Sequence, residues 1–142
     1  MAKVERIVTL NAPIEKVFDY ISDPNSELEI VPGITDIRDV VGQGVGRRYS
    51  WSYKMMGIPF KGEGEVIEYV PNERYVTKSK GGIISTWTWT VEPKDNGTQL
   101  SLVVEYTVPV PVLGKIGERL TVRQTEREAD LAMALLKDKL ES

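Results

Sequence analysis

The residues best placed to do chemistry are polar side chains that interrupt an apolar pattern near the end of the chain. At about 100° per residue, a helix over 112–141 gathers leucines on one face: Leu113, Leu120, Leu131 and Leu135. Gln124 and Arg127 fall on that same face, where a helix that only closed a core would carry leucine. Either side chain could therefore bind a carboxylate, a carbonyl or a phenol of a ligand.

A second use of Arg127 is structural. Since a lone buried charge is very costly, an inward arginine needs a partner or must reach the edge of the helix with its charged end. Glu68 is the candidate acid, because alternation along a strand over 59–70 puts it on the inward side with four other residues: Phe60, Gly62, Gly64 and Val66. The sequence leaves the ligand anchor and the Arg127–Glu68 pair as alternatives.

Aromatic side chains form the largest candidate group. Alternation in the strands predicted near 46–56, 83–92 and 97–108 places them on one face of a sheet: Tyr49, Trp51, Tyr53, Trp87, Trp89 and Tyr106. They could simply fill the core, but buried tyrosine and tryptophan need partners for their O–H and N–H groups. We therefore expect them, together with Phe60 and Leu120, to line a cavity that holds a ligand or water.

The composition excludes several kinds of chemistry. The chain has no histidine and no cysteine, so the commonest general base, the commonest metal ligand, thiolate nucleophiles and disulfides are all missing. We expect no metal and no cofactor, and we assign no catalytic residue. The net charge is −3 and the basic residues are scattered, which does not suit a nucleic-acid partner. The glycine-rich segment 42–46 fits no phosphate-loop spacing and is interpreted as a turn.

Two loops are too apolar for ordinary turns. The first, 55–60, contains Met55, Met56 and Ile58, and the second, 108–114, contains Val112 and Leu113. They could be buried at one end of the fold. Alternatively, they form a portal for ligand entry or a face that transiently touches a membrane or a protein, since exposed apolar patches are commonly functional.

The elements that must position these residues follow a simple order. We expect a strand over 3–11, a helix that starts near Asn11–Pro13 and a short helix within 26–30. Strands then follow near 34–41, 46–56, 59–70, 73–80, 83–92 and 97–108, joined by short turns that imply antiparallel pairing. The predicted fold is α+β: a curved antiparallel sheet of about seven strands wrapped around a long C-terminal helix, with two short helices after the first strand. At 142 residues the chain should form a single domain over 1–142.

Several stretches carry a resemblance to a known group of proteins. They are Asn11-Ala-Pro-Ile-Glu-Lys-Val-Phe-Asp-Tyr-Ile-Ser-Asp23, Tyr69-Val-Pro-Asn-Glu-Arg-Tyr75, Thr88-Trp-Thr-Val-Glu-Pro93 and the closing helix from Leu113-Gly114 to Lys137. With them the chain resembles the START-like superfamily of the helix-grip fold, which includes polyketide cyclase/dehydrase-like (SRPBCC) proteins. The resemblance implies a cavity between the sheet and the last helix that binds lipids, hydrophobic metabolites or aromatic polyketides.

Our first functional hypothesis is the binding or transport of a small hydrophobic ligand, such as a lipid, a quinone or an aromatic or polyketide-like metabolite. We expect a mostly apolar cavity of a few hundred Å³. The alternatives are a cyclase/dehydrase-like enzyme, with a tyrosine, Glu68 or Arg127 as acid or orienting group, and an accessory module that interacts with another enzyme. The N-terminus lacks the pattern of a signal peptide and no apolar run approaches roughly 18 residues, so we expect a cytoplasmic protein.

Overall fold

The computed structural model describes residues 2–55, 57–107 and 110–141, with the side chains of 110–118 left out of the description. The elements follow one another in the order β1 (Ala2–Leu10), α1 (Ile14–Ile21), η1 (Pro24–Ser26), α2 (Glu27–Ile30), β2 (Ile34–Val41), β3 (Arg48–Met55), β4 (Ile58–Val70), β5 (Arg74–Gly81), β6 (Ile84–Lys94), β7 (Gly97–Thr107) and α3 (Val110–Glu141). The predicted element order is confirmed, and the predicted strand ends differ from these by at most two residues.

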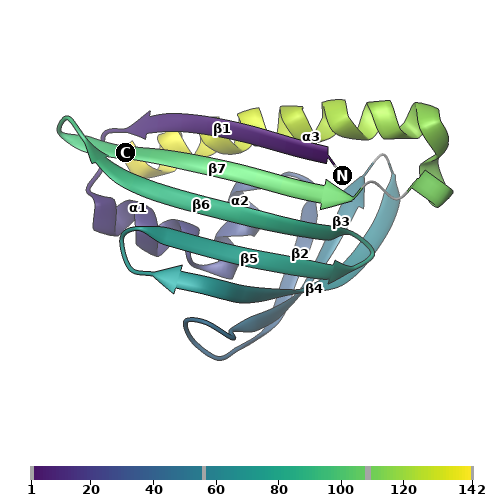
Figure 1. The fold of residues 1–142 in the computed structure, drawn as a ribbon, viewed down its shortest axis with the longest axis horizontal. Helices are drawn as coiled ribbons and strands as arrows, with labels where there is room; N and C mark the ends of the chain where they lie inside the picture. Colours follow the sequence, from purple (N-terminus) through teal and green to yellow (C-terminus); the bar gives the residue numbers. More distant parts are fainter. Residues whose placement is uncertain (1, 56, 108–109, 142) are drawn as a thin grey trace.

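The strands form one antiparallel sheet in the order β1-β7-β6-β5-β4-β3-β2. Consecutive strands from β2 to β7 are neighbours, as the short turns predicted. Strand β1 lies beside β7 and forms one edge of the sheet. Figure 1 shows the sheet curving around α3, which contacts β1 and α2. The predicted helix-grip architecture is therefore confirmed.

The two short helices follow from local sequence. In α1 the buried residues Val17, Phe18 and Ile21 form one apolar stripe toward the sheet. The side chain of Asp23 accepts a hydrogen bond of 3.0 Å from the backbone N–H of Asn25, which caps the turn that begins at Pro24. Helix α2 follows this turn directly, and its first residue, Glu27, contacts Tyr49 of β3.

Strand β4 is irregular, and this overturns the prediction for Glu68. Its register against β5 shifts between Val66 and Glu68, as in a β-bulge, which exchanges the two faces of the strand downstream. Val66 is buried before the shift, and Tyr69 packs on Phe18 after it, with ring centroids 5.4 Å apart. Glu68 consequently faces outward, where the Arg74 Nε lies 3.0 Å from its carboxylate.

Two glycines of β4 allow the rings of β3 to lie close against the neighbouring strand. Tyr49 is paired with Gly64, and Trp51 is paired with Gly62. A Cβ at Gly64 would overlap the Tyr49 ring, and a Cβ at Gly62 would overlap the Trp51 ring and a β5 carbonyl. Glycine inside a strand permits such a close approach, because it has no side chain to separate the strands.

The inward face of α3 is not the predicted leucine face. Its buried residues are mostly small or unbranched: Thr121, Ala129, Ala132, Met133, Leu136 and Leu140. Leu120 and Leu131 are 48% and 46% exposed, and Arg127 is exposed. The face of α3 that packs on the sheet thus differs from the predicted face by about one residue, a rotation of roughly 100° about the helix axis. Small side chains face inward because they let the helix approach the curved sheet closely.

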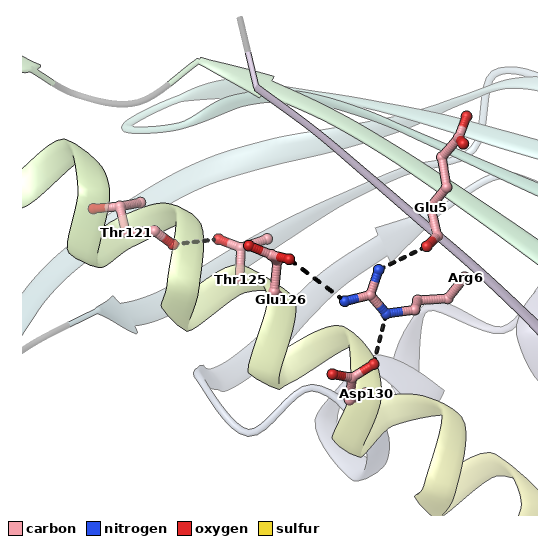
Figure 2. A network of polar contacts seen from close by, with 6 residues as sticks. All are labelled: Glu5, Arg6, Thr121, Thr125, Glu126 and Asp130. Atoms are coloured by element: carbon pink, nitrogen blue, oxygen red, sulfur yellow. Dashed lines mark hydrogen bonds and ion pairs between the residues drawn. The ribbon is translucent and has the colours of Figure 1, made fainter.

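A polar contact between β1 and α3 accompanies this orientation of the helix. Figure 2 shows the Arg6 side chain reaching from β1 to two acids on the outer side of α3. Its Nε donates to Asp130 Oδ1 at 2.6 Å, a terminal nitrogen lies 3.8 Å from Glu126, and the other donates to the Glu5 carbonyl at 2.7 Å. Glu126 and Asp130 thus face β1, while the neighbouring face of the helix packs on the sheet. Within the described residues, no helix is long and apolar enough to cross a membrane.

Candidate functional site

The candidate site is a cavity of about 90 Å³ between the inner face of the sheet and the helices α2 and α3. Residues from α2, the following turn, β2, β3, β5, β6, β7 and α3 line it: Glu27, Val31, Ile34, Tyr49, Trp51, Tyr53, Met55, Thr77, Ser79, Ile83, Ser85, Trp87, Val104, Tyr106, Thr125 and Glu128. The cavity is smaller than the few hundred Å³ predicted. Since a buried water needs ~10–15 Å³ on this measure, the space suits several waters or one small ligand.

Most of the predicted rings lie at this cavity. Tyr49, Trp51 and Tyr53 come from alternate positions of β3, and Trp87 and Tyr106 come from β6 and β7. The cavity lining does not include Trp89 or Phe60, which are buried in the surrounding core. Trp89 lies behind the lining residue Trp87, with the two ring centroids 6.3 Å apart. Whether the lining rings contact a ligand stays a prediction.

The sequence prediction missed two acids of the cavity, and each is hydrogen-bonded to a tyrosine. The Tyr49 hydroxyl donates to Glu27 Oε1 at 3.2 Å, and the Tyr53 hydroxyl donates to Glu128 Oε2 at 2.6 Å. Because Tyr49 and Tyr53 are four positions apart on one strand, they share a face and can hold one acid from each helix.

Burial sets the protonation of these groups. It raises the pKa of Glu27 to about 7, against the opposing effect of the Tyr49 hydrogen bond. It also raises the pKa of Glu128, against the hydrogen bonds from Tyr53 and Gln124. Burial raises the pKa values of Tyr49 and Tyr53 as well, so both phenols stay neutral donors. At neutral pH Glu27 can therefore either give or take a proton.

Two buried donors at the cavity lack hydrogen-bond partners among the described residues. They are the indole N–H of Trp51 and the hydroxyl of Tyr106, in side chains of residues only 5% and 4% exposed. Burial raises the pKa of Tyr106, which outweighs the opposite effect of the nearby Thr125 hydroxyl. Buried polar groups are normally satisfied, so an unpaired donor in a residue that lines a cavity would gain from an acceptor atom of a ligand or a water that reached it.

The polar residues predicted on α3 have other roles. The Gln124 side chain is partly buried, and its amide donates to Glu128 Oε1 at 3.4 Å, so it supports an acid of the cavity. Arg127 is exposed, and its predicted partner Glu68 is paired with Arg74 on the outer face. The predicted Arg127–Glu68 pair is therefore wrong, and Leu120, exposed as well, does not line the cavity.

Signals for the missed acids are present in the sequence. Glu27 lies three residues before the buried Ile30 in a helical stretch, which places both on one face. Glu128 lies four residues after Gln124 and so follows it on the helix surface. The sequence prediction also missed the hydroxyl groups of the cavity, because polar strand residues are typical of a water-facing surface: Thr77, Ser79, Ser85 and Thr125.

Gly33 shapes the site from the turn between α2 and β2. A Cβ at Gly33 would overlap the Tyr53 ring and lie 2.9 Å from Glu128 Oε1. Only a glycine at this position leaves room for the Tyr53–Glu128 hydrogen bond as it stands.

The predicted portal is described only in part. Met55 is buried and lines the cavity, whereas Ile58 is partly buried against the core. Met56 and the side chains of Val112 and Leu113 lie outside the described residues. Met55 ends β3, Ile83 lies in the turn between β5 and β6, and Tyr106 lies near the end of β7. Figure 1 shows this end of β7 and the β5–β6 turn on the side of the sheet where α3 begins. A portal at that end stays a prediction.

Nothing in the described residues groups three or more acids in a way that could hold a metal ion. The cavity has four kinds of chemical group: aromatic walls, hydroxyl groups, two carboxyl groups that are hydrogen-bonded to tyrosines, and two unpaired donors.

Comparisons with known proteins agree with this architecture. The family model described as "Polyketide cyclase / dehydrase and lipid transport" matches residues 1–141. No curated protein matches the chain.

Several solved structures share the fold. TTHA0849 from Thermus thermophilus is 20% identical with a TM-score of 0.84, over 98% of this chain and 97% of that one. The Zhui aromatase/cyclase from Streptomyces sp. R1128 is 17% identical with a TM-score of 0.79, over 99% and 93%. Ara h 8.0201 is 16% identical with a TM-score of 0.69, over 98% and 97%. At these identities the similarity establishes the fold.

Proposed function

The chain belongs to the polyketide cyclase/dehydrase and lipid transport family, and we propose that it binds a small, largely apolar ligand in the cavity between the sheet and α3. The observation that carries the proposal is the pair of unpaired buried donors, Trp51 N–H and Tyr106 O–H, at a cavity with aromatic walls. Ligand sites of this kind combine apolar walls with a few polar groups that fix orientation.

The size of the cavity restricts the ligand. A volume of about 90 Å³ suits a single ring or a short branched chain better than a whole lipid. A lipid or a multi-ring metabolite would need α3 or the loops at the open end to move outward. We therefore propose a small metabolite, or the end group of a longer molecule, as the occupant.

Two measurements test this proposal. Native mass spectrometry of protein purified from its source should show a retained small molecule. In an NMR titration with benzyl alcohol, a neutral one-ring probe, the Trp51 indole N–H resonance should shift saturably. Tyr106→Phe should weaken binding roughly 2- to 10-fold, which corresponds to one ordinary hydrogen bond.

Tyr69→Phe is a matched control, since Tyr69 packs among Phe18 and Tyr75 outside the cavity lining. It should leave the affinity for benzyl alcohol unchanged. Absence of a retained molecule together with no saturable shift for any neutral probe would refute the proposal.

An enzyme of cyclase or dehydrase type is the second candidate, and the Glu27 carboxyl group favours it. A general acid or base works best when its pKa is near the operating pH, and the pKa of Glu27 is about 7. Turnover of a polyketone that is lost in Glu27→Gln, with ligand binding retained, would support this role.

A further inference from the structure

We infer that the cavity selects ligands that carry a positively charged amine and rejects ligands that carry a carboxylate. This inference names the ligand class for the proposed binding function and rests on it. It would exclude fatty acids and other anionic lipids as occupants of the cavity.

All the side chains of the described lining that can carry a charge at neutral pH are acidic. The ionisable side chains of the lining are the carboxyl groups of Glu27 and Glu128 and the phenols of three tyrosines, and no lysine or arginine is among the described lining residues. Neither acid has a salt bridge to any basic side chain within the described part of the chain. Their described side-chain partners are neutral: Tyr49 for Glu27, and Tyr53 and Gln124 for Glu128.

In their charged form such acids are costly unless a cation approaches them, and an approaching cation favours that charged form over the protonated one. A buried carboxylate without a counter-charge loses its hydration, and a neutral hydroxyl replaces only part of it. A ligand ammonium group between these acids would supply the missing charge. A ligand carboxylate would add a further negative charge to a poorly hydrated space, where like charges repel strongly.

The walls favour a cation as well. The faces of tryptophan and tyrosine rings attract ammonium groups, and the effect grows when the cation is desolvated. Tyr49, Trp51, Tyr53 and Trp87 all line this space. Acids and aromatic rings around one small cavity form the arrangement that holds an amine by charge and by ring contact together.

The unpaired donors belong to residues that line the same cavity as the acids. The N–H of Trp51 cannot contact an ammonium group favourably, so it needs an acceptor. We therefore assign to the ligand a second, neutral acceptor, such as a hydroxyl, ether or ketone oxygen, near Trp51 and Tyr106. The ligand class is then a small amine with an apolar body and one such oxygen.

Three one-ring probes of nearly equal size test the charge preference in the wild-type protein: benzylammonium, benzyl alcohol and benzoate. NMR titration at neutral pH, followed at the Trp51 indole N–H, gives the three affinities. We expect benzylammonium to bind at least tenfold more tightly than benzyl alcohol, and benzoate at least tenfold more weakly. Equal affinities, or tighter binding of benzoate, would overturn the inference.

Variants then locate the origin of the preference. Glu27→Gln and Glu128→Gln should each reduce the ratio of benzylammonium to benzyl alcohol affinity by at least threefold. Glu126→Gln is the matched control: it removes the same charge from the outer side of α3, where Glu126 faces Arg6 (Figure 2), and should keep the ratio. An unchanged ratio in both cavity variants would overturn the inference.

The outcomes also separate this inference from the proposed function. Binding of benzyl alcohol without any preference for the amine supports the binding function and refutes the charge selection. Failure of all three probes refutes the charge selection, and it refutes the binding function as well when native mass spectrometry also shows no retained molecule.

Discussion

The Tyr53 hydroxyl donates a hydrogen bond of 2.6 Å to Glu128 Oε2, which joins β3, the strand beside the edge strand β2, to α3 at the wall of the cavity. The Tyr49–Glu27 hydrogen bond makes the same kind of link between β3 and α2. One strand therefore holds both helices through acids, and the positions of these acids depend on its tyrosines.

Removal of the Tyr53 hydroxyl should destabilise the protein. In Tyr53→Phe, Glu128 loses the shorter of its two described hydrogen bonds while the carboxyl group stays largely buried. We expect the free energy of unfolding to fall by about 1–3 kcal/mol, the range for a hydrogen bond to a charged group with a partner left unsatisfied. Urea unfolding near pH 7 measures it.

Removal of the Tyr106 hydroxyl, in contrast, should not lower the free energy of unfolding. This group is buried without a partner in the described residues, so Tyr106→Phe removes no hydrogen bond and relieves an unsatisfied donor. The free energy of unfolding should stay within about 0.5 kcal/mol of the wild type or rise. A loss comparable to that of Tyr53→Phe would show that the hydroxyl has a protein partner.

A methyl group at Gly33 should disturb the site through Tyr53. Gly33→Ala places a Cβ inside the Tyr53 ring and 2.9 Å from Glu128 Oε1, so one of them must move. We expect a loss of about 1–3 kcal/mol in unfolding free energy, typical of overpacking. The same substitution in a Tyr53→Ala background should cost clearly less, and equal costs in both backgrounds would argue against this steric origin.

The buried Glu27 should make stability depend on pH. Its pKa is near the ordinary value of 4.5 in the unfolded chain and about 7 in the folded protein, so the folded state binds the extra proton between these values. This contribution to stability is fully present below pH 4.5 and is lost as the pH rises through 7. It amounts to up to about 3 kcal/mol, from the size of the shift.

Glu27→Gln isolates this effect. The unfolding free energy of the wild type, measured relative to this variant, should fall as the pH rises from about 4.5 to 7.5. Urea unfolding at a series of pH values gives the difference, and a flat difference over this range would contradict the raised pKa.

The contact of Arg6 with α3 should contribute modestly to stability. Arg6→Gln removes the ion pairs to Asp130 and Glu126, which are partly exposed, and should cost about 0.5–1 kcal/mol. Hydrogen exchange of the α3 amides near these acids should become faster. Lys3→Gln is the control, because the Lys3–Glu5 pair is more exposed and both partners belong to β1.

The sequence predicted the fold well because its signals are local and repeated. Regular alternation in β3 placed Tyr49, Trp51 and Tyr53 on the inner face, and the turn at Asp95–Gly97 separated β6 from β7. The same reasoning failed at Glu68, since one inserted residue in β4 reverses every side chain after it. Composition does not reveal such a bulge.

The candidate site was harder to predict because it depends on the rotation of α3. Leu120 and Leu131 suggested an apolar face, yet the packed face uses Ala129 and Ala132, which give a weak apolar signal. The rotation is set by packing and polar contacts between residues far apart in the chain, such as Arg6 and Asp130, which the helical pattern alone does not show. The acid Glu128 came into the cavity as a result, and Arg127 turned outward.

The place of β1 in the sheet has a consequence for how the chain folds. Strands β2 to β7 pair with sequence neighbours, whereas β1 pairs with β7, from Ala2 opposite Tyr106 to Leu10 opposite Thr98. Pairing of two strands that are so far apart in the chain costs loop-closure entropy before stabilising contacts form. We therefore expect the β1–β7 pairing late in folding. Because β1 precedes the other strands in the chain, it can pair with β7 only after nearly the whole sheet has been synthesised. The β1–β7 pairing and the Arg6 contact with α3 should therefore form in the same late step, which completes the cavity.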